Sequence, residues 1–321
     1  MRKILSLTLA VLMVVTAFAF VGCGAKPAML GLGVASTVTP TDATVEKAGK
    51  VATAVTVAAV LLDADGKILA CDIDTLEASL GMTAEGTTVL PATYESKRDK
   101  GDAYGMQAYG GKTEWYIQVD NLEAVLVGKT KDEAKALLLD TGYGNDAVVS
   151  AGCTIDIADM IEAVLEACAN AKEVGSMEGD ALSVSIVCDN SSSTKDATPE
   201  RAGVLQAEFT FAALTVKDGK VTGVVTDAMN AKSTFDTAGK VVDASEPKTK
   251  GELKEGYGMA AYAQTTEYYL QAAEFDKQCI GKTSQEISAM KDGTDALVAA
   301  GCTIAVSPLV EAVVKAIAAA K

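Results

Sequence analysis

The sequence predicts an α+β fold, made of two tandem copies of an antiparallel sheet that is flanked by helices. Three observations lead to this prediction. The chain repeats itself, each copy contains two strand patterns joined by an Asp-Gly turn, and each copy ends in an Ala- and Val-rich helical pattern. Strands come before helices in both copies, an order typical of α+β domains.

The repeat is visible in several matched motifs. The Asp-Gly-Lys-Ile motif at Asp65 returns as Asp-Gly-Lys-Val at Asp218, 153 positions later. The stretch Ala-Gly-Cys-Thr-Ile occurs at residues 151–155 and again at 300–304, an offset of 149, so the second copy lacks four residues near the 141–144 loop. We therefore expect one copy over residues 29–172 and another over residues 181–321, each of an ordinary domain size.

Strand patterns open each copy. Val55–Leu62 and Phe209–Val216 are apolar, rich in β-branched or aromatic residues, and precede the Asp-Gly turn, which is a strong hairpin signal. The returning strands are expected at Lys67–Ile73 and Lys220–Thr226, and earlier strands at Leu30–Thr37 and Leu182–Val187.

Helical patterns close each copy. They are expected at Thr113–Leu126, Asp156–Lys172, Thr266–Cys279 and Pro308–Lys321. Ser307 is expected to be the N-cap of the last helix, with Pro308 at its first position.

The two Gly-Lys-Thr motifs do not form a phosphate-binding P-loop. That loop needs a glycine five positions before the Gly-Lys, where this chain has Glu123 and Asp276. Instead, Thr130 and Thr283 each begin a capping box that opens a short helix.

The N-terminus has the pattern of a lipoprotein signal peptide. Arg2 and Lys3 precede an apolar run from Ile4 to Val21, and Phe-Val-Gly-Cys at residues 20–23 resembles a bacterial lipobox. We expect residues 1–22 to be removed and Cys23 to be lipidated, which anchors the chain to membrane lipid. The alternative is an uncleaved membrane anchor. Both place the rest of the chain on the extracytoplasmic face of the cell membrane.

Composition excludes several classes of function. Removing the signal peptide changes the formal charge from −15 to −17, and so acidic a protein is not expected to bind nucleic acid. Histidine and Cys-x-x-Cys pairs are absent, which excludes histidine-dependent catalytic triads and makes zinc or haem sites unexpected. Most of the remaining six cysteines are expected to be small buried residues. The acidic pairs Asp72 with Asp74 and Glu95 with Asp99 are expected to be solvated surface.

The succession of hairpin, aspartate, Gly-x-Thr turn and Ala/Val-rich helix resembles the FMN-binding domain family. That family includes flavin-carrying subunits of sodium-pumping quinone reductases and tandem flavin lipoproteins of Gram-positive extracellular electron transfer. In many members the last threonine of the turn carries FMN through a phosphoester. The resemblance implies a flavin site in each copy, at the matching positions Asp146, Gly152 and Thr154, and Asp295, Gly301 and Thr303.

The resemblance also implies how FMN is held, covalently or non-covalently. The glycine lets the backbone approach a phosphate, and the N-terminus of the next helix attracts an anion. Aromatic side chains of the Tyr-Gly-Met motifs and the helices after them would line the flavin ring. These are Tyr104, Tyr109, Trp115, Tyr257, Tyr262 and Tyr268.

Two functions remain open. The first is a lipid-anchored flavin-based electron carrier that serves a membrane redox partner. The alternative is a flavin-free ligand-binding or surface-interaction lipoprotein of the same fold. A carrier or binding protein is expected over a catalyst, because no activated nucleophile is visible.

Overall fold

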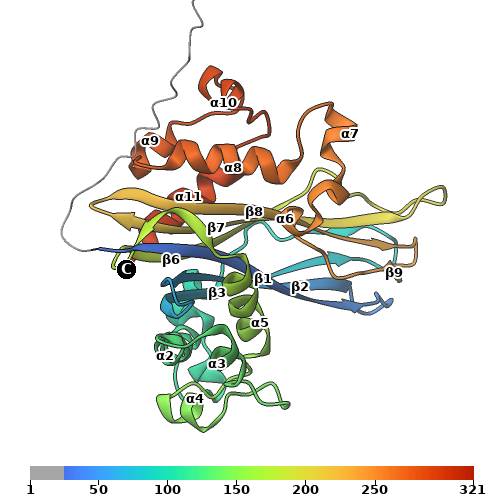
Figure 1. Ribbon diagram of the computed structural model, residues 1–321. Coiled ribbons are helices and arrows are strands. Elements are labelled where there is room, and N and C mark those ends of the chain that lie inside the picture. The colour runs from blue at the N-terminus through green and yellow to red at the C-terminus, as the bar shows by residue number, and fades with distance from the viewer. Residues whose placement is uncertain (1–24) are drawn as a thin grey trace, which may run out of the picture.

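The computed structural model describes residues 25–321, and the polypeptide forms four layers (Figure 1). Helices of the first copy, the sheet of the first copy, the sheet of the second copy and the helices of the second copy follow one another. The expected signal peptide and the lipidation site Cys23 lie outside the described residues. Among residues 25–321, no helix combines the length and apolar character needed to cross a bilayer.

Both sheets are antiparallel and both are flanked by helices, as expected. The first has the order β4-β3-β2-β1-β5 and the second has the order β6-β7-β8-β9. The strands are β1 (Pro27–Thr41), β2 (Gly49–Leu62), β3 (Ile68–Met82), β4 (Thr88–Val89), β5 (Lys172–Met177), β6 (Ala181–Asn190), β7 (Gly203–Lys217), β8 (Lys220–Phe235) and β9 (Val241–Asp243). The returning strands β3 and β8 therefore run well past the expected ends at Ile73 and Thr226.

The helices follow the strands in both copies, except that β5 comes after α5 and completes the first sheet. They are α1 (Lys97–Lys100), α2 (Trp115–Leu126), α3 (Lys131–Lys135), α4 (Asp146–Ala151), α5 (Ala158–Asn170), α6 (Lys250–Leu253), α7 (Met259–Ala263), α8 (Tyr268–Cys279), α9 (Ser284–Ser288), α10 (Asp295–Ala299) and α11 (Ser307–Ala319). The capping boxes at Thr130 and Thr283 are confirmed. The expected N-cap at Ser307 is wrong. Val306 is the N-cap, and the Ser307 hydroxyl lies 3.2 Å from Asp292 Oδ1, to which it donates.

Each hairpin turn contains the expected Asp-Gly pair. Asp218 and Gly219 have φ of 50° and 74° and join β7 to β8 as a two-residue turn, which requires positive φ at both positions. The first copy uses a longer loop between β2 and β3, in which Gly66 has φ of 76°.

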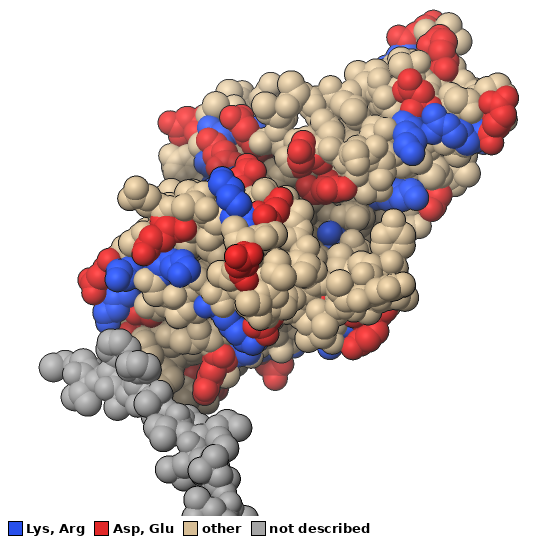
Figure 2. All heavy atoms as spheres, turned by 90° about the horizontal axis from the view of Figure 1, so that it is seen from above, with Lys and Arg blue, Asp and Glu red and all other residues tan. Residues whose placement is uncertain are grey.

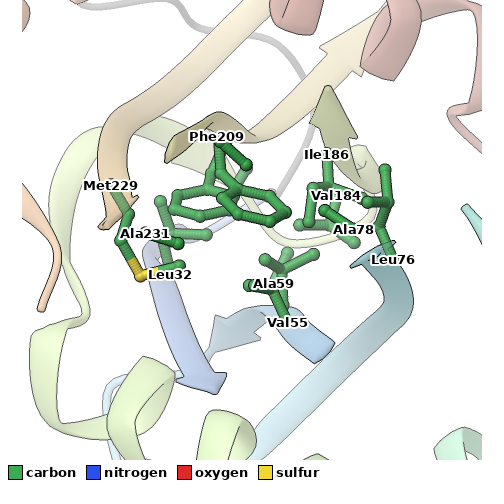
Figure 3. Close-up of a cluster of buried hydrophobic side chains, with 14 of the residues drawn as sticks. Leu32, Val55, Ala59, Leu76, Ala78, Val184, Ile186, Phe209, Met229 and Ala231 are labelled. Atoms are coloured by element: carbon green, nitrogen blue, oxygen red, sulfur yellow. The ribbon is translucent and has the colours of Figure 1, made fainter. Parts of the chain in front are cut away.

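The two sheets pack face to face and share one core (Figure 3). Val55 and Ala59 of β2 and Phe209 of β7 belong to this core, whereas Val60 of β2 points to the helices of its own copy. Successive residues of a strand point to opposite faces, so both faces of each sheet are buried. This explains why β2 and β7 read as continuous apolar runs.

Reciprocal contacts join the two copies. The Ala43 N–H donates to the Gly239 carbonyl at 2.9 Å, and the Ala197 N–H donates to the Gly86 carbonyl at 2.8 Å. Ala43 and Ala197 occupy the same place in the two copies, and so do Gly86 and Gly239. Such reciprocity is the mark of an approximate twofold relation.

One contact breaks this symmetry. Lys315 of α11 forms a salt bridge with Asp99 of α1, whereas Glu166 occupies the place of Lys315 in the first copy and accepts the Val34 N–H at 2.8 Å.

The helical face of the second copy carries interspersed acidic and basic side chains (Figure 2).

The shared core predicts the effect of Phe209→Ala. The Phe209 side chain is fully buried between the sheets, so its loss should lower the free energy of unfolding by about 3 to 5 kcal/mol. Urea unfolding followed by circular dichroism measures this change. Tyr109→Ala, at a side chain that is 92% exposed, is the control and should change stability by less than about 0.5 kcal/mol. A loss below about 1 kcal/mol for Phe209→Ala would contradict the shared core.

Candidate functional site

A buried glutamine holds the Gly-Cys-Thr turn in each copy. Gln118 Oε1 accepts the Thr154 N–H at 2.8 Å and the Thr154 hydroxyl at 3.1 Å. Gln271 Oε1 accepts the Thr303 N–H at 2.8 Å and the Thr303 hydroxyl at 2.9 Å. Both glutamines are 1% exposed. The two threonines named by the resemblance therefore share one geometry.

The same glutamines reach the Tyr-Gly-Met motifs. Gln118 Nε2 lies 3.4 Å from Met106 Sδ, and Gln271 Nε2 lies 3.5 Å from Met259 Sδ. Both amides also donate to a backbone carbonyl, Gln118 to that of Thr113 at 3.2 Å and Gln271 to that of Thr266 at 2.8 Å. Each glutamine thus joins two motifs that lie far apart in the sequence.

A glutamate fixes the Tyr-Gly-Met loop from the other side. Glu114 accepts the Met106 N–H at 2.8 Å, and Glu267 accepts the Met259 N–H at 2.9 Å. Sequence reasoning missed these glutamates and the glutamines. The signal that could have found them is the repeat itself, since both pairs recur at the offset of 153.

The expected aromatic residues fall into two groups. Lys97 Nζ lies 5.3 Å from the Tyr104 ring centre and 5.2 Å from the Trp115 ring centre. Lys250 Nζ lies 5.2 Å and 4.4 Å from the ring centres of Tyr257 and Tyr268. These distances are typical of cation–π contacts. The structure therefore brings these four aromatic residues together in two equivalent clusters.

The other two tyrosines lie apart from these clusters. Tyr109 and Tyr262 are 92% and 94% exposed. Tyr109 lies in a short 3-10 helix and Tyr262 in α7, and both extend into solvent, so they do not line a flavin ring site.

The expected phosphate geometry differs from the observed turn. Asp146 and Asp295 begin α4 and α10, the helices that precede the turns, and Gly152 caps the C-terminus of α4 with φ of 106°. The next helix, α5, begins at Ala158, four residues after Thr154. The closing helix, expected from Asp156, therefore begins two residues later than predicted. The backbone at Gly152 faces the carbonyl end of a helix, which does not attract anions.

Asp72 and Asp74 are buried, so the expectation that they are solvated surface is wrong. Arg98 pairs with three acidic residues of its own copy, with Asp72 at 3.6 Å, Asp120 at 2.8 Å and Glu123. Burial raises the pKa of Asp74 to about 6, against the effect of its hydrogen bonds to Ser96 and Arg98. Sequence reasoning missed Arg98, which lies more than 20 positions from its partners.

The second copy lacks this ion network. Gly251 stands in the place of Arg98, and Asp276 in the place of Glu123. Asp276 accepts the Thr226 N–H at 3.1 Å and the Thr226 hydroxyl at 2.7 Å. Burial raises the pKa of Asp276 to about 7, although the hydrogen bonds from Thr226 lower it.

The second copy also has an open cleft of about 690 Å³, and the equivalent region of the first copy has a smaller pocket of about 320 Å³, lined in part by Glu77, Lys97 and Tyr104. In the first copy, the Thr37 hydroxyl of β1 donates to Asp159 Oδ2 of α5 at 3.4 Å. Their equivalents in the second copy are Asp189 and Pro308, neither of which can donate a side-chain hydrogen bond. Both line the cleft.

The cleft lies where the two copies meet. Its walls come from strands β6, β7 and β8, helices α6, α7, α8 and α11, and a loop of the first copy. The lining residues are Ala92, Thr93, Tyr94, Val187, Cys188, Asp189, Glu208, Phe209, Thr210, Ala228, Asn230, Lys250, Met259, Tyr268, Ile304, Ala305, Ser307, Pro308, Leu309 and Glu311. Of the residues named by the resemblance, Thr303 lies next to the cleft-lining Ile304, and Tyr257 packs on the cleft-lining Tyr268 at 6.0 Å between ring centres.

The cysteines form no disulfide among the described residues. Cys153, Cys279 and Cys302 are buried, and Cys71, Cys168 and Cys188 are partly buried. In the described part of the chain, no group of three or more Cys, Asp or Glu side chains could hold a metal ion.

Comparison with known proteins adds no relative. No family model, no curated protein and no solved structure matches this chain. The assignment of the site therefore depends on the geometry above and on the agreement between the two copies.

The buried glutamine predicts the effect of Gln271→Leu. Leucine would leave the Thr303 N–H and the Thr266 carbonyl without their partners, which should lower the free energy of unfolding by about 2 to 3 kcal/mol. Gln107→Leu, at an exposed side chain, is the control for the same chemical change. Thermal unfolding of both variants measures the difference. Equal stability of the two variants would contradict the role of Gln271.

The buried carboxyl of Asp276 predicts a pH dependence. Its pKa is raised from 3.8 to about 7 in the folded state, so the folded state binds more protons between these values. The free energy of unfolding should therefore fall as pH rises from about 4 to about 7. Asp276→Asn should reduce this slope, whereas Asp65→Asn, at an exposed carboxylate, should not. Urea midpoints across this pH range measure the slope, and an unchanged slope in Asp276→Asn would contradict the burial of a protonated carboxyl.

Proposed function

We propose that this chain is a lipid-anchored, extracytoplasmic ligand-binding protein built from two FMN-binding-like copies, and that the second copy holds the ligand. The observation that carries the proposal is the difference between equivalent regions. The first copy has a pocket of about 320 Å³ in this region and a Thr37–Asp159 contact between β1 and α5, whereas the corresponding cleft of the second copy measures about 690 Å³. A cleft of this size is typical of small-molecule sites.

The character of the cleft walls supports this proposal. Apolar and aromatic surface from Met259 and Tyr268 lies beside polar groups such as Asn230 and Lys250. Ligand sites commonly combine an apolar lining with a few polar groups that fix orientation.

The position of the cleft also supports a binding role. Ala92 and Tyr94 of the first copy form part of the wall, so the site depends on both copies. Ligand sites are frequent at such junctions between domains.

A second candidate is the flavin-based electron carrier, with FMN bound covalently or non-covalently and a redox partner in the membrane. The observation that favours it is the position of Thr303. Its side chain is exposed, it adjoins the cleft, and the cluster of Lys250, Tyr257 and Tyr268 lies on the same copy. Attachment of a phosphoester would require the Thr303 hydroxyl to leave Gln271. Thr154, which is less exposed, would be the weaker attachment site.

Purification from the native host tests the proposal. Native mass spectrometry should detect a bound small molecule that is released when the chain unfolds, and the unfolded chain should carry no flavin mass on Thr154 or Thr303. Ala92→Trp, which places a large ring at the cleft wall, should abolish the bound molecule. Ser245→Trp is the matched control, because Ser245 is the exposed counterpart of Ala92 in the second copy and does not line the cleft. It should leave the bound molecule in place.

Three other outcomes are informative. A bound molecule that survives in Ala92→Trp would place the ligand elsewhere. A yellow chain that keeps a flavin mass after unfolding, and loses it in Thr303→Val, would establish the flavin carrier instead. Protein that carries no small molecule, and gains no thermal stability from added ligands, would contradict both candidates.

A further inference from the structure

We propose that the cleft of the second copy takes an organic ammonium ion with an apolar or aromatic body. This inference rests on the proposed binding function and names the chemistry of the ligand. Most polar groups of the cleft are hydrogen-bond acceptors or carry negative charge. An ammonium ion would provide the positive charge and the hydrogen-bond donors that they lack.

A row of acceptor side chains crosses the sheet beneath the cleft. Asp189 of β6 lies directly opposite Glu208 of β7, and Glu208 lies directly opposite Asn230 of β8. All three line the cleft. Side chains directly opposite each other on adjacent strands point to the same face. Two carboxylates and an amide therefore lie side by side on the outer face of this sheet.

The first copy has a different row at the same register. Thr37 lies opposite Ala54, and Ala54 lies opposite Glu77. A single carboxylate remains there, and the Thr37 hydroxyl is bonded to Asp159. The pair of adjacent carboxylates is thus a feature of the second copy, where the cleft lies.

The adjacent carboxylates have no cation of their own. Like charges directly opposite each other on neighbouring strands destabilise a sheet. Glu208 Oε1 accepts the Ser191 hydroxyl at 2.6 Å and the Gln206 amide at 3.3 Å, but no salt bridge among the described residues involves Glu208 or Asp189. Asn230 Oδ1 is buried and has no hydrogen-bond partner within the described chain. A bound ammonium group would offset the repulsion between the two carboxylates and donate hydrogen bonds to them.

The opposite wall has the same charge character. Glu311 of α11 adds a third carboxylate. The cationic residue that lines the cleft is Lys250, and its ammonium lies over the rings of Tyr257 and Tyr268. The net charge of the wall is therefore negative.

The geometry favours an organic cation over a metal ion. Among the described residues, no group of three or more Cys, Asp or Glu side chains could hold a metal ion, and this includes the carboxylates of the cleft. The volume of about 690 Å³ and the apolar surface of Tyr94, Tyr268 and Met259 suit a larger body. Aromatic faces also attract ammonium groups directly.

Three probes of one shape and different charge test the inference. They are phenethylammonium, 2-phenylethanol and 3-phenylpropionate, each titrated into the full chain and followed by NMR chemical-shift changes. Phenethylammonium should bind at least about tenfold more tightly than the neutral alcohol, since hydrogen bonds to charged groups contribute about 1.5 to 3 kcal/mol. The carboxylate should bind most weakly.

Two variants locate the effect. Glu208→Gln keeps the shape and an acceptor for Ser191 but removes the charge, and should weaken phenethylammonium binding about tenfold with little change for the alcohol. Glu162→Gln is the matched control, because Glu162 is the exposed counterpart of Glu311 in the first copy. It should leave all three affinities unchanged.

The outcomes separate this inference from the proposed function. Equal or tighter binding of the alcohol or the carboxylate, abolished by Ala92→Trp, would overturn the cation inference and leave the binding function intact. If Glu208→Gln and Glu162→Gln weakened phenethylammonium binding equally, the preference would come from the net charge of the protein, and the assignment of the cation to this cleft would be overturned. Failure of all three probes to bind would overturn the inference, whereas the proposed function would still be decided by the molecule carried by native protein.

Discussion

The contact between the two sheets is the interaction on which the rest of the structure depends. Each sheet has two apolar faces, and its own helices cover one of them. The other face is covered by the other copy, around side chains such as Phe209 and Val55. Because burial of apolar area is the main driving force of folding, separation of the copies would expose one face of each sheet. The duplication therefore completes the core.

This arrangement also positions the site. Face-to-face packing brings residues 92–94 of the first copy against β6 of the second copy, where they form part of the cleft wall. Within each copy, Gln118 or Gln271 holds the Gly-Cys-Thr turn against the Tyr-Gly-Met loop. The frame is the same in both copies. The copies differ in loop lengths, in the added strand β5 of the first sheet, and in side chains such as Thr37 and Asp159 against Asp189 and Pro308.

Much of the fold could be predicted from the sequence, and much of the site could not. Strands, hairpins and capping boxes depend on local patterns, which is why the turn at Asp218 and the cap at Thr283 were predicted correctly. The full length of β3 was missed because Asp74 looks like a strand end, and it is buried by partners that lie more than 20 residues away. Gln271 looks like a solvated helix position until tertiary packing places Thr303 beside it. The cleft was missed because the segments that line it, such as residues 92–94 and 304–311, come together only in the folded chain.

The central claim is that the second copy, whose cleft is larger than the equivalent pocket of the first copy, is the one that binds a ligand. The most direct measurement is a crystal structure of the protein purified from its native host. The account predicts ligand density over the row of Asp189, Glu208 and Asn230, and an intact Thr37–Asp159 contact in the other copy. Density for water alone over that row, or equivalent ligand density in both copies, would contradict it.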